Sequence, residues 1–320
     1  MEATIPTVAT IATPPRRRSS PETPPQSPET SLRERELASG SRGSFPKLVV
    51  ILIEFGATLA FVFLTASLVV TTARDGMTAT RLAVIGIGFG GIYSGLLTLA
   101  SVVGASNRIV GLNPALTVAT TVWSLVRAAR RDDGGTRSAA IALEGVLTIL
   151  AQCFGALGAL VLLPLVVPDP GAAIYPYGAP AVGGGASLAQ AFGWETLGSF
   201  ALCFAALSVG ARGPGSGGVG SAGTTVGRAR ASVDATAPLA QGAALAAATL
   251  ITFPFAGGAL NPVRVVTLVM VPAKTGLLFV LPLAELLGAG LALLFAVTAM
   301  GGWTARMSED DDDGGEGKDR

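Results

Sequence analysis

The 320-residue sequence contains no histidine and only two cysteines. Histidine is the side chain that most often serves as a general base or a metal ligand, so its absence removes many catalytic and metal sites. No metal-ligand cluster, nucleophile–base pair or Gly-rich phosphate loop appears either, and we expect no enzyme activity, cofactor, metal or nucleic-acid partner. Cys153 and Cys203 lie in apolar segments, which predicts free buried thiols and no disulfide.

Charge is also scarce, because charged residues make up 13% of the chain and hydrophobic residues 50%. A soluble domain of this length needs a charged surface, so this composition indicates a membrane protein. Much of the charge lies in two polar segments. Residues 1–46 are rich in Pro, Ser, Thr and Arg, and residues 304–320 are acidic, so we expect two disordered tails around a membrane domain at 47–303.

Six apolar segments of the membrane domain are long enough to cross a bilayer core, which needs about 20 helical residues. They cover approximately 48–73, 81–103, 138–167, 187–210, 234–255 and 275–300. Two further apolar runs, 113–124 and 261–271, have half that length, which predicts re-entrant segments that are buried in protein or line a water-filled cavity. With this topology, 18 of the 22 Lys and Arg residues lie on the side of the termini, which favours cytoplasmic termini.

Both half-spans begin with an Asn-Pro step, although the chain contains only three asparagines. A single Asn-Pro step indicates a turn or a helix start, because Asn caps the first helical turn and Pro fits its first position. Two such steps, each at the head of a half-length span, indicate more than capping. These two asparagine boxes are Asn113-Pro114-Ala115 and Asn261-Pro262-Val263.

The boxes belong to an internal repeat, about 48–167 and 187–300. Each box follows a span that carries a glutamate, Glu54 or Glu195. Each box is followed by a span that carries Gln152 or Glu285, with Gly-Ala three and four residues later. Three matches in the same order make coincidence improbable. Because each copy holds three crossings, an odd number, the second copy must be inverted relative to the first.

With both boxes, the paired glutamates and the Gln-x-x-Gly-Ala pattern, residues 48–300 resemble the major intrinsic protein family, the aquaporins and aquaglyceroporins. The resemblance implies an all-α membrane protein with six transmembrane helices and two re-entrant half-helices in an inverted repeat. It also implies a homotetramer in the lipid bilayer with a pore in each subunit. We therefore expect a passive channel for water that excludes protons and ions.

The inverted repeat places the N-termini of the two half-helices head to head near the bilayer midplane. Each N-terminus carries the positive end of a helix dipole, which opposes the passage of cations and hydronium. We expect Asn113 and Asn261 to donate amide N–H groups to passing water, so that the file of water molecules does not relay protons. In the family, glutamates equivalent to Glu54 and Glu195 accept hydrogen bonds from the re-entrant loops, which implies that they are structural braces, together with Gln152.

The selectivity filter of the family corresponds to four positions of this chain. They are Arg264, Thr249, Gly258 and either Ile92 or Tyr93. The last choice stays open because the loop before Asn113 is longer than usual by one residue. Thr and Gly imply a constriction wider than a strict water filter, so glycerol, urea, ammonia and hydrogen peroxide are further candidate solutes. Val265 stands where glycerol channels have an aspartate, which counts against a dedicated glycerol channel.

Two departures from the family pattern leave other functions open. Glu285 stands where the family usually has a proline, and it is the candidate ion site of an alternative reading as an ion-coupled secondary transporter. Val263 replaces the usual alanine of the second box and adds bulk where the half-helices meet. A non-conducting, scaffold-like relative is therefore the other alternative.

Overall fold

The computed structural model describes residues 47–73, 76–105, 110–130, 135–167, 178–210, 236–270 and 275–300. These residues form helices and short connections, with no strand among them. The two expected tails, 1–46 and 304–320, lie outside the described residues.

Six helices of the described residues are long and apolar enough to cross a membrane. They are α2 (Lys47–Thr71), α3 (Ala79–Ala100), α5 (Gly135–Val166), α6 (Leu188–Gly210), α7 (Thr236–Ala256) and α9 (Thr275–Phe295). Short π-helical turns, η2 (Ser101–Ala105) and η4 (Ala296–Met300), continue α3 and α9. The six spans expected from hydropathy are thereby confirmed.

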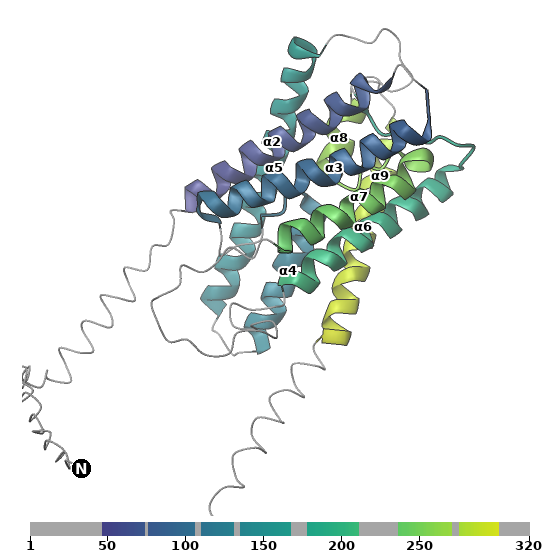
Figure 1. Ribbon diagram of the computed structural model, residues 1–320. Coiled ribbons are helices and arrows are strands. Elements are labelled where there is room, and N and C mark those ends of the chain that lie inside the picture. The colour runs from purple at the N-terminus through teal and green to yellow at the C-terminus, as the bar shows by residue number, and fades with distance from the viewer. Residues whose placement is uncertain are drawn as a thin grey trace, which may run out of the picture. The chain divides into compact units, whose positions relative to one another are not determined.

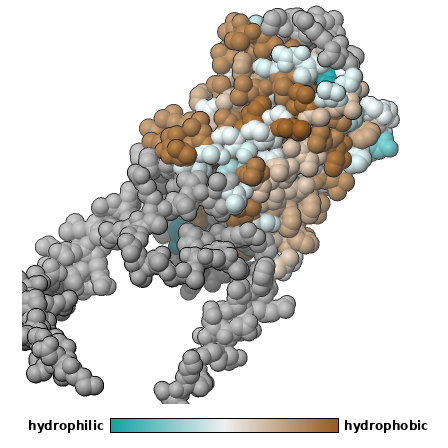
Figure 2. Space-filling view, viewed as in Figure 1, coloured by the Kyte–Doolittle hydropathy of each residue, from teal (hydrophilic) through white to brown (hydrophobic). Residues whose placement is uncertain are grey.

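These helices are apolar on their outer surfaces as well as on their inner faces. Leu165 is 75% exposed and Phe279 68% exposed, and many other large aliphatic side chains also point outward. Figure 2 shows apolar surface in brown over much of the visible face of the described helices. Helices that are apolar on all sides are typical of a membrane environment, where lipid covers the outer face.

The two half-helices are α4 (Pro114–Arg130) and α8 (Pro262–Met270), which Figure 1 shows at opposite ends of the bundle. Helix α8 has about the expected length. Helix α4 extends beyond residue 124 to Arg130, because residues 125–130 consist mainly of Leu, Ala and Arg, which have good helix propensity. The apolar pattern therefore located the start of α4 but not its end.

The helices of the second half of the chain pack on one another in the same pattern as those of the first half. Helix α2 packs on α3 and α5 as α6 packs on α7 and α9. Half-helix α4 contacts α5 and α9, and half-helix α8 contacts α9 and α5, while α3 and α7 join the two repeats to each other. Every principal contact of one repeat thus has a counterpart in the other, and the fold is the inverted repeat that the sequence predicts.

Two glycines fix the helix crossings of the repeats. A Cβ atom at Gly155 of α5 would collide with the backbone oxygen of Phe55 in α2. A Cβ atom at Gly288 of α9 would collide in the same way with the backbone oxygen of Thr196 in α6. Phe55 and Thr196 each directly follow the glutamate of their span. The two crossings are therefore equivalent, and only glycine allows the backbones to approach so closely.

We expect Gly288→Ala to lower the free energy of unfolding by about 1–3 kcal/mol, because the added methyl group overpacks the α6–α9 crossing. Gly290→Ala is the matched control on the same helix, because a Cβ atom there meets no atom within 4 Å. Unfolding curves in detergent measure both variants. Equal stability of the two variants would contradict the assigned crossing.

Candidate functional site

The asparagines of the two boxes cap the half-helices that follow them. The side-chain oxygen Oδ1 of Asn113 accepts a hydrogen bond from the backbone N–H of Ala115 at 2.9 Å. Oδ1 of Asn261 accepts one from Val263 at 3.2 Å. Proline occupies the next position of each helix, where no intrahelical N–H bond is needed. Capping therefore turns each amide oxygen toward its own helix and leaves each NH2 group directed elsewhere.

Those NH2 groups join the two boxes directly. Nδ2 of Asn113 donates to the backbone oxygen of Leu260 at 2.7 Å, and Nδ2 of Asn261 donates to the backbone oxygen of Leu112 at 2.7 Å. Each asparagine thus binds the residue that precedes the other asparagine, and the tips of α4 and α8 touch. Since an amide NH2 group has two N–H bonds, one N–H of each asparagine remains for another acceptor.

Leu112 and Leu260 have an unusual backbone conformation that the sequence did not reveal. Both have φ of 50°, in the left-handed region that non-glycine residues rarely occupy. Such a conformation costs about 1–3 kcal/mol and persists only where the surroundings enforce it. Here the backbone oxygen of each leucine is held by the opposite asparagine. The only signal in the sequence is their place directly before the boxes.

Glu54 holds the first of these loops from inside the bundle. Its carboxylate accepts the backbone N–H of Gly111 at 2.9 Å and of Leu112 at 3.2 Å. Nε2 of Gln152 donates to the same carboxylate at 3.1 Å and to Oγ1 of Thr117 at 2.8 Å. Glu54 is buried, and these donors compensate for the water that a buried carboxylate loses.

Glu195 holds the second loop in the same way. It accepts the backbone N–H of Ala259 at 3.1 Å and of Leu260 at 2.9 Å. Glu285, which the sequence left without a role, joins this group. Its Oε1 accepts the backbone N–H of Asn261 at 2.7 Å, and its carboxyl group lies close enough to that of Glu195 to interact with it. The second box is therefore held by two carboxyl groups.

Arg264 is fully buried one turn into α8. Its guanidinium carbon lies 4.6 Å from the ring centroid of Phe89 on α3, a cation–π contact. Nη2 donates to the backbone oxygen of Gly178 at 3.3 Å, and Nη1 makes a long contact of 3.5 Å with that of Gly258. Nε has no hydrogen-bond partner within the protein. The guanidinium group is therefore fixed in position, with its Nε–H still unsatisfied.

Two threonine hydroxyls of α7 are also buried without a partner. They belong to Thr249, an expected filter residue, and to Thr252 one turn further along the helix. A Cβ atom at Gly258 would lie 3.2 Å from Oγ1 of Thr252, so the absence of a side chain there leaves this hydroxyl uncovered. Buried polar groups are normally hydrogen-bonded, so these two hydroxyls are left available to a bound water.

The residue of α3 that faces Arg264 is Phe89, whereas the sequence offered Ile92 or Tyr93. Tyr93 lies one turn further along α3, and its hydroxyl donates to the backbone oxygen of Gly111 at 2.9 Å. Ile92 is half-buried and packs against the core cluster beside it. The connection between α3 and α4 includes the π-helical turn η2 (Ser101–Ala105). Phe89 and Tyr93 share one helix face, so a one-turn shift exchanges them.

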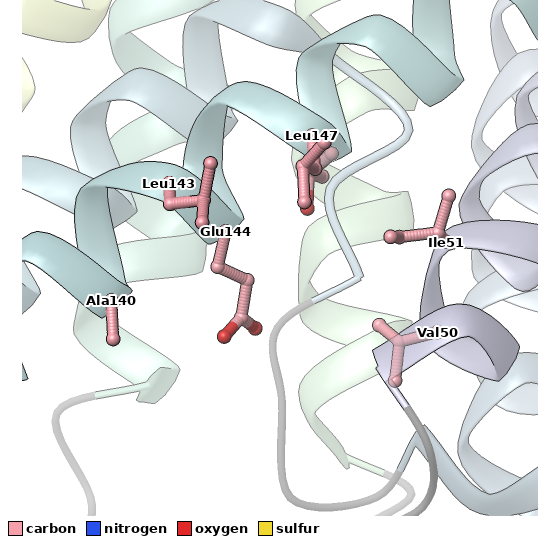
Figure 3. Close-up of a pocket in the computed structure, with 7 residues that line it drawn as sticks. Val50, Ile51, Ala140, Leu143, Glu144 and Leu147 are labelled. Atoms are coloured by element: carbon pink, nitrogen blue, oxygen red, sulfur yellow. The ribbon is translucent and has the colours of Figure 1, made fainter.

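A separate pocket lies between the N-terminal parts of α2 and α5. Figure 3 shows the Glu144 carboxylate directed into it from α5, with Val50 and Ile51 on the side of α2. Val50 and Thr148 line it one helical turn before Glu54 and Gln152. The pocket therefore lies beneath the first brace and not between the two boxes. Among the described residues, no group of His, Cys, Asp and Glu could hold a metal ion.

Comparison with known families decides between the classes of membrane protein. Residues 43–296 match the family model described as "Major intrinsic protein". The chain belongs to the major intrinsic protein family. Family membership and the six apolar helices make it an integral multi-pass membrane channel for water or small solutes. The resemblance seen in the asparagine boxes is confirmed.

A solved structure shares the fold of this family member. The chain is similar to the X-ray structure of the aquaglyceroporin from Plasmodium falciparum, with a TM-score of 0.53 and 15% sequence identity. The similarity covers 78% of this chain and 96% of that one. No curated protein sequence matches the chain. The structural match supports the six helices and two half-helices described above.

We expect Glu54→Leu to destabilise the fold and lower water permeability, because it leaves the backbone N–H groups of Gly111 and Leu112 buried without acceptors. Each unpaired group costs about 1–3 kcal/mol. Glu54→Gln keeps one acceptor oxygen and should have an intermediate effect. Detergent unfolding curves and proteoliposome swelling measure the series. Two variants indistinguishable from the unsubstituted protein would show that Glu54 does not support the loop.

Proposed function

We propose that this family member is a passive channel for water that excludes protons and ions, with no chemical step and no cofactor. The observation that carries the proposal is the crossed pair of hydrogen bonds from Asn113 and Asn261 to the opposite loops. These bonds bring two helix N-termini together in the interior of a bundle whose outer surface is apolar. Such an arrangement suits a narrow polar path through the bilayer.

The meeting of the two tips accounts for the expected exclusion of protons. Both helix N-termini carry partial positive charge, which raises the energy of a cation or hydronium at the tips. The remaining N–H group of each asparagine donates to the oxygen of a passing water. A water that accepts from two fixed donors presents its own hydrogens outward, so the file of waters on either side does not relay protons through it.

We assign the selectivity filter to Arg264, Phe89, Thr249 and Gly258. Arg264 repels cations and offers an unpaired Nε–H, while Thr249 offers an unpaired hydroxyl. Thr249 and Gly258 have small side chains and Phe89 fills one wall. This composition favours a constriction that passes water and also admits small neutral solutes, for which glycerol, urea, ammonia and hydrogen peroxide are the candidates.

We also propose that both termini are cytoplasmic and that the protein assembles as a homotetramer. The distribution of Lys and Arg supports cytoplasmic termini. Family membership supports a homotetramer with one pore in each subunit. Native mass spectrometry of the purified protein checks the tetramer, and protease access to the tails in cells with an intact or permeabilised membrane checks the orientation. A monomer, or tails cleaved from outside, would contradict these two statements.

Stopped-flow swelling of proteoliposomes tests the function. We expect osmotic water flux well above that of empty vesicles, with no requirement for a proton or sodium gradient. Flux that needs such a gradient would instead identify an ion-coupled transporter. Flux equal to that of empty vesicles, from protein shown to be folded, would identify a scaffold. A pH-sensitive dye inside the same vesicles should show no proton entry.

The filter assignment predicts different effects for two neighbouring residues of α3. We expect Phe89→Ala to increase glycerol and urea permeability severalfold, because it removes the wall that faces Arg264. Ile92→Ala is the matched control and should leave solute permeability unchanged, because Ile92 packs beside the core. We expect Arg264→Ala to admit both larger solutes and cations. Solute flux that responds to Ile92→Ala and not to Phe89→Ala would overturn the assignment.

A further inference from the structure

Glu285 is a buried ionisable residue that the pore mechanism does not use. Its position in α9 is equivalent to that of Gln152 in α5, because each lies three residues before a crossing glycine, Gly288 or Gly155. Each side chain also contacts the brace glutamate of its own repeat. The two repeats therefore place different chemical groups, an amide and a carboxyl, at one structural position.

The amide of Gln152 acts as a hydrogen-bond donor at this position. Its Nε2 donates to Oε2 of Glu54 at 3.1 Å. An ionised Glu285 has no hydrogen to donate to Glu195. Its Oε1 accepts from the backbone N–H of Asn261, while its Oε2 is buried without any donor. Two ionised carboxylates in contact repel each other, and in a fully buried site they do not both ionise.

The charges around Glu285 also indicate that one of the two carboxyl groups is protonated. The ionisable side chains within electrostatic reach among the described residues are Glu195 of α6, Arg264 of α8 and Cys203 of α6. With a neutral thiol and a charged guanidinium, the group has zero net charge only if one carboxyl is protonated. Glu195 accepts two backbone N–H groups, which favours its ionised form. The proton is therefore assigned to Glu285.

We propose that Glu285 is a protonated positioning residue, whose Oε2–H donates to Glu195 while its Oε1 accepts the backbone N–H of Asn261. The carboxylic acid thereby does for the second asparagine box what the Gln152 amide does for the first. The proton satisfies the Oε2 atom and removes the repulsion between the two carboxyl groups. Glu285 then holds Asn261 in place and is not the ion site of a transporter.

Infrared difference spectroscopy of the reconstituted protein tests the protonation state directly. A protonated carboxyl has a C=O stretching band that an ionised carboxylate lacks, and the band shifts in deuterated water. We expect the unsubstituted protein to show this band at neutral pH and Glu285→Gln to lose it. Glu144→Gln, which alters a carboxylate outside the braces, is the control and should keep the band. Identical carboxylic-acid bands in the unsubstituted protein and Glu285→Gln would overturn the proposal.

Water permeability tests whether Glu285 positions Asn261. Of the two experiments, only this one rests on the proposed water channel. Glu285→Gln supplies a neutral donor and acceptor as Gln152 does, so we expect permeability within about twofold of the unsubstituted protein. Glu285→Leu removes the acceptor of the Asn261 N–H and should lower permeability by about tenfold. Equal losses in both variants would show that the ionised carboxylate is needed and would overturn the proposal. The infrared result does not depend on conduction, so failure of the channel function is distinguishable from failure of this inference.

Discussion

The structure depends on two short hydrogen bonds that run in opposite directions between the asparagine boxes. Asn113 binds the backbone oxygen of Leu260, and Asn261 binds that of Leu112, each at 2.7 Å. Neither half-helix crosses the bundle alone, so these bonds connect the two halves of the chain at its centre. The capping bonds within each box fix the amide orientation that makes the crossed bonds possible. Helix capping and channel formation are therefore one arrangement of the same two side chains.

The surrounding contacts keep the tips in this arrangement. The leucines that accept the crossed bonds have left-handed backbone conformations, which are strained for a side chain of that size. Their N–H groups are held by Glu54 and Glu195, so each leucine is fixed through both its N–H and its C=O group. The crossing glycines bring the helices that carry these glutamates close enough to their partners. These buried carboxylates thus hold the shape of the two loops.

Much of this arrangement followed from the sequence, because the signals were local and repeated. Six apolar segments, two Asn-Pro steps and two glutamates at matching places predicted the helices, the half-helices and the inverted repeat. The end of α4 and the contact of Phe89 with Arg264 were not predicted. Leu, Ala and Arg at residues 125–130 are good helix formers, so α4 continues through two charged residues and hydropathy does not mark its end. This contact was missed because the length of the connection before Asn113 sets the register of α3, and the equivalent connection before Asn261 is shorter.

The two repeats are equivalent in backbone but differ in chemistry. The first loop is held by a carboxylate and an amide, and the second by two carboxyl groups beside a buried arginine. This difference was visible in the sequence as Gln152 against Glu285, but its meaning needed the side-chain contacts. It places a group that resembled an ion-coupling site within the support of the second box. The asymmetry therefore gives Glu285 a contact with the second box that Gln152 does not make with the first.

The most direct test of the central claim is the water permeability of proteoliposomes that contain Asn113→Ala, Asn261→Ala or the double variant, each confirmed to be folded. If the crossed bonds hold the pore open, each single variant should lose most of the permeability, and the double variant should lose little more, because one broken bond already separates the tips. Single variants that conduct water as well as the unsubstituted protein would contradict the account.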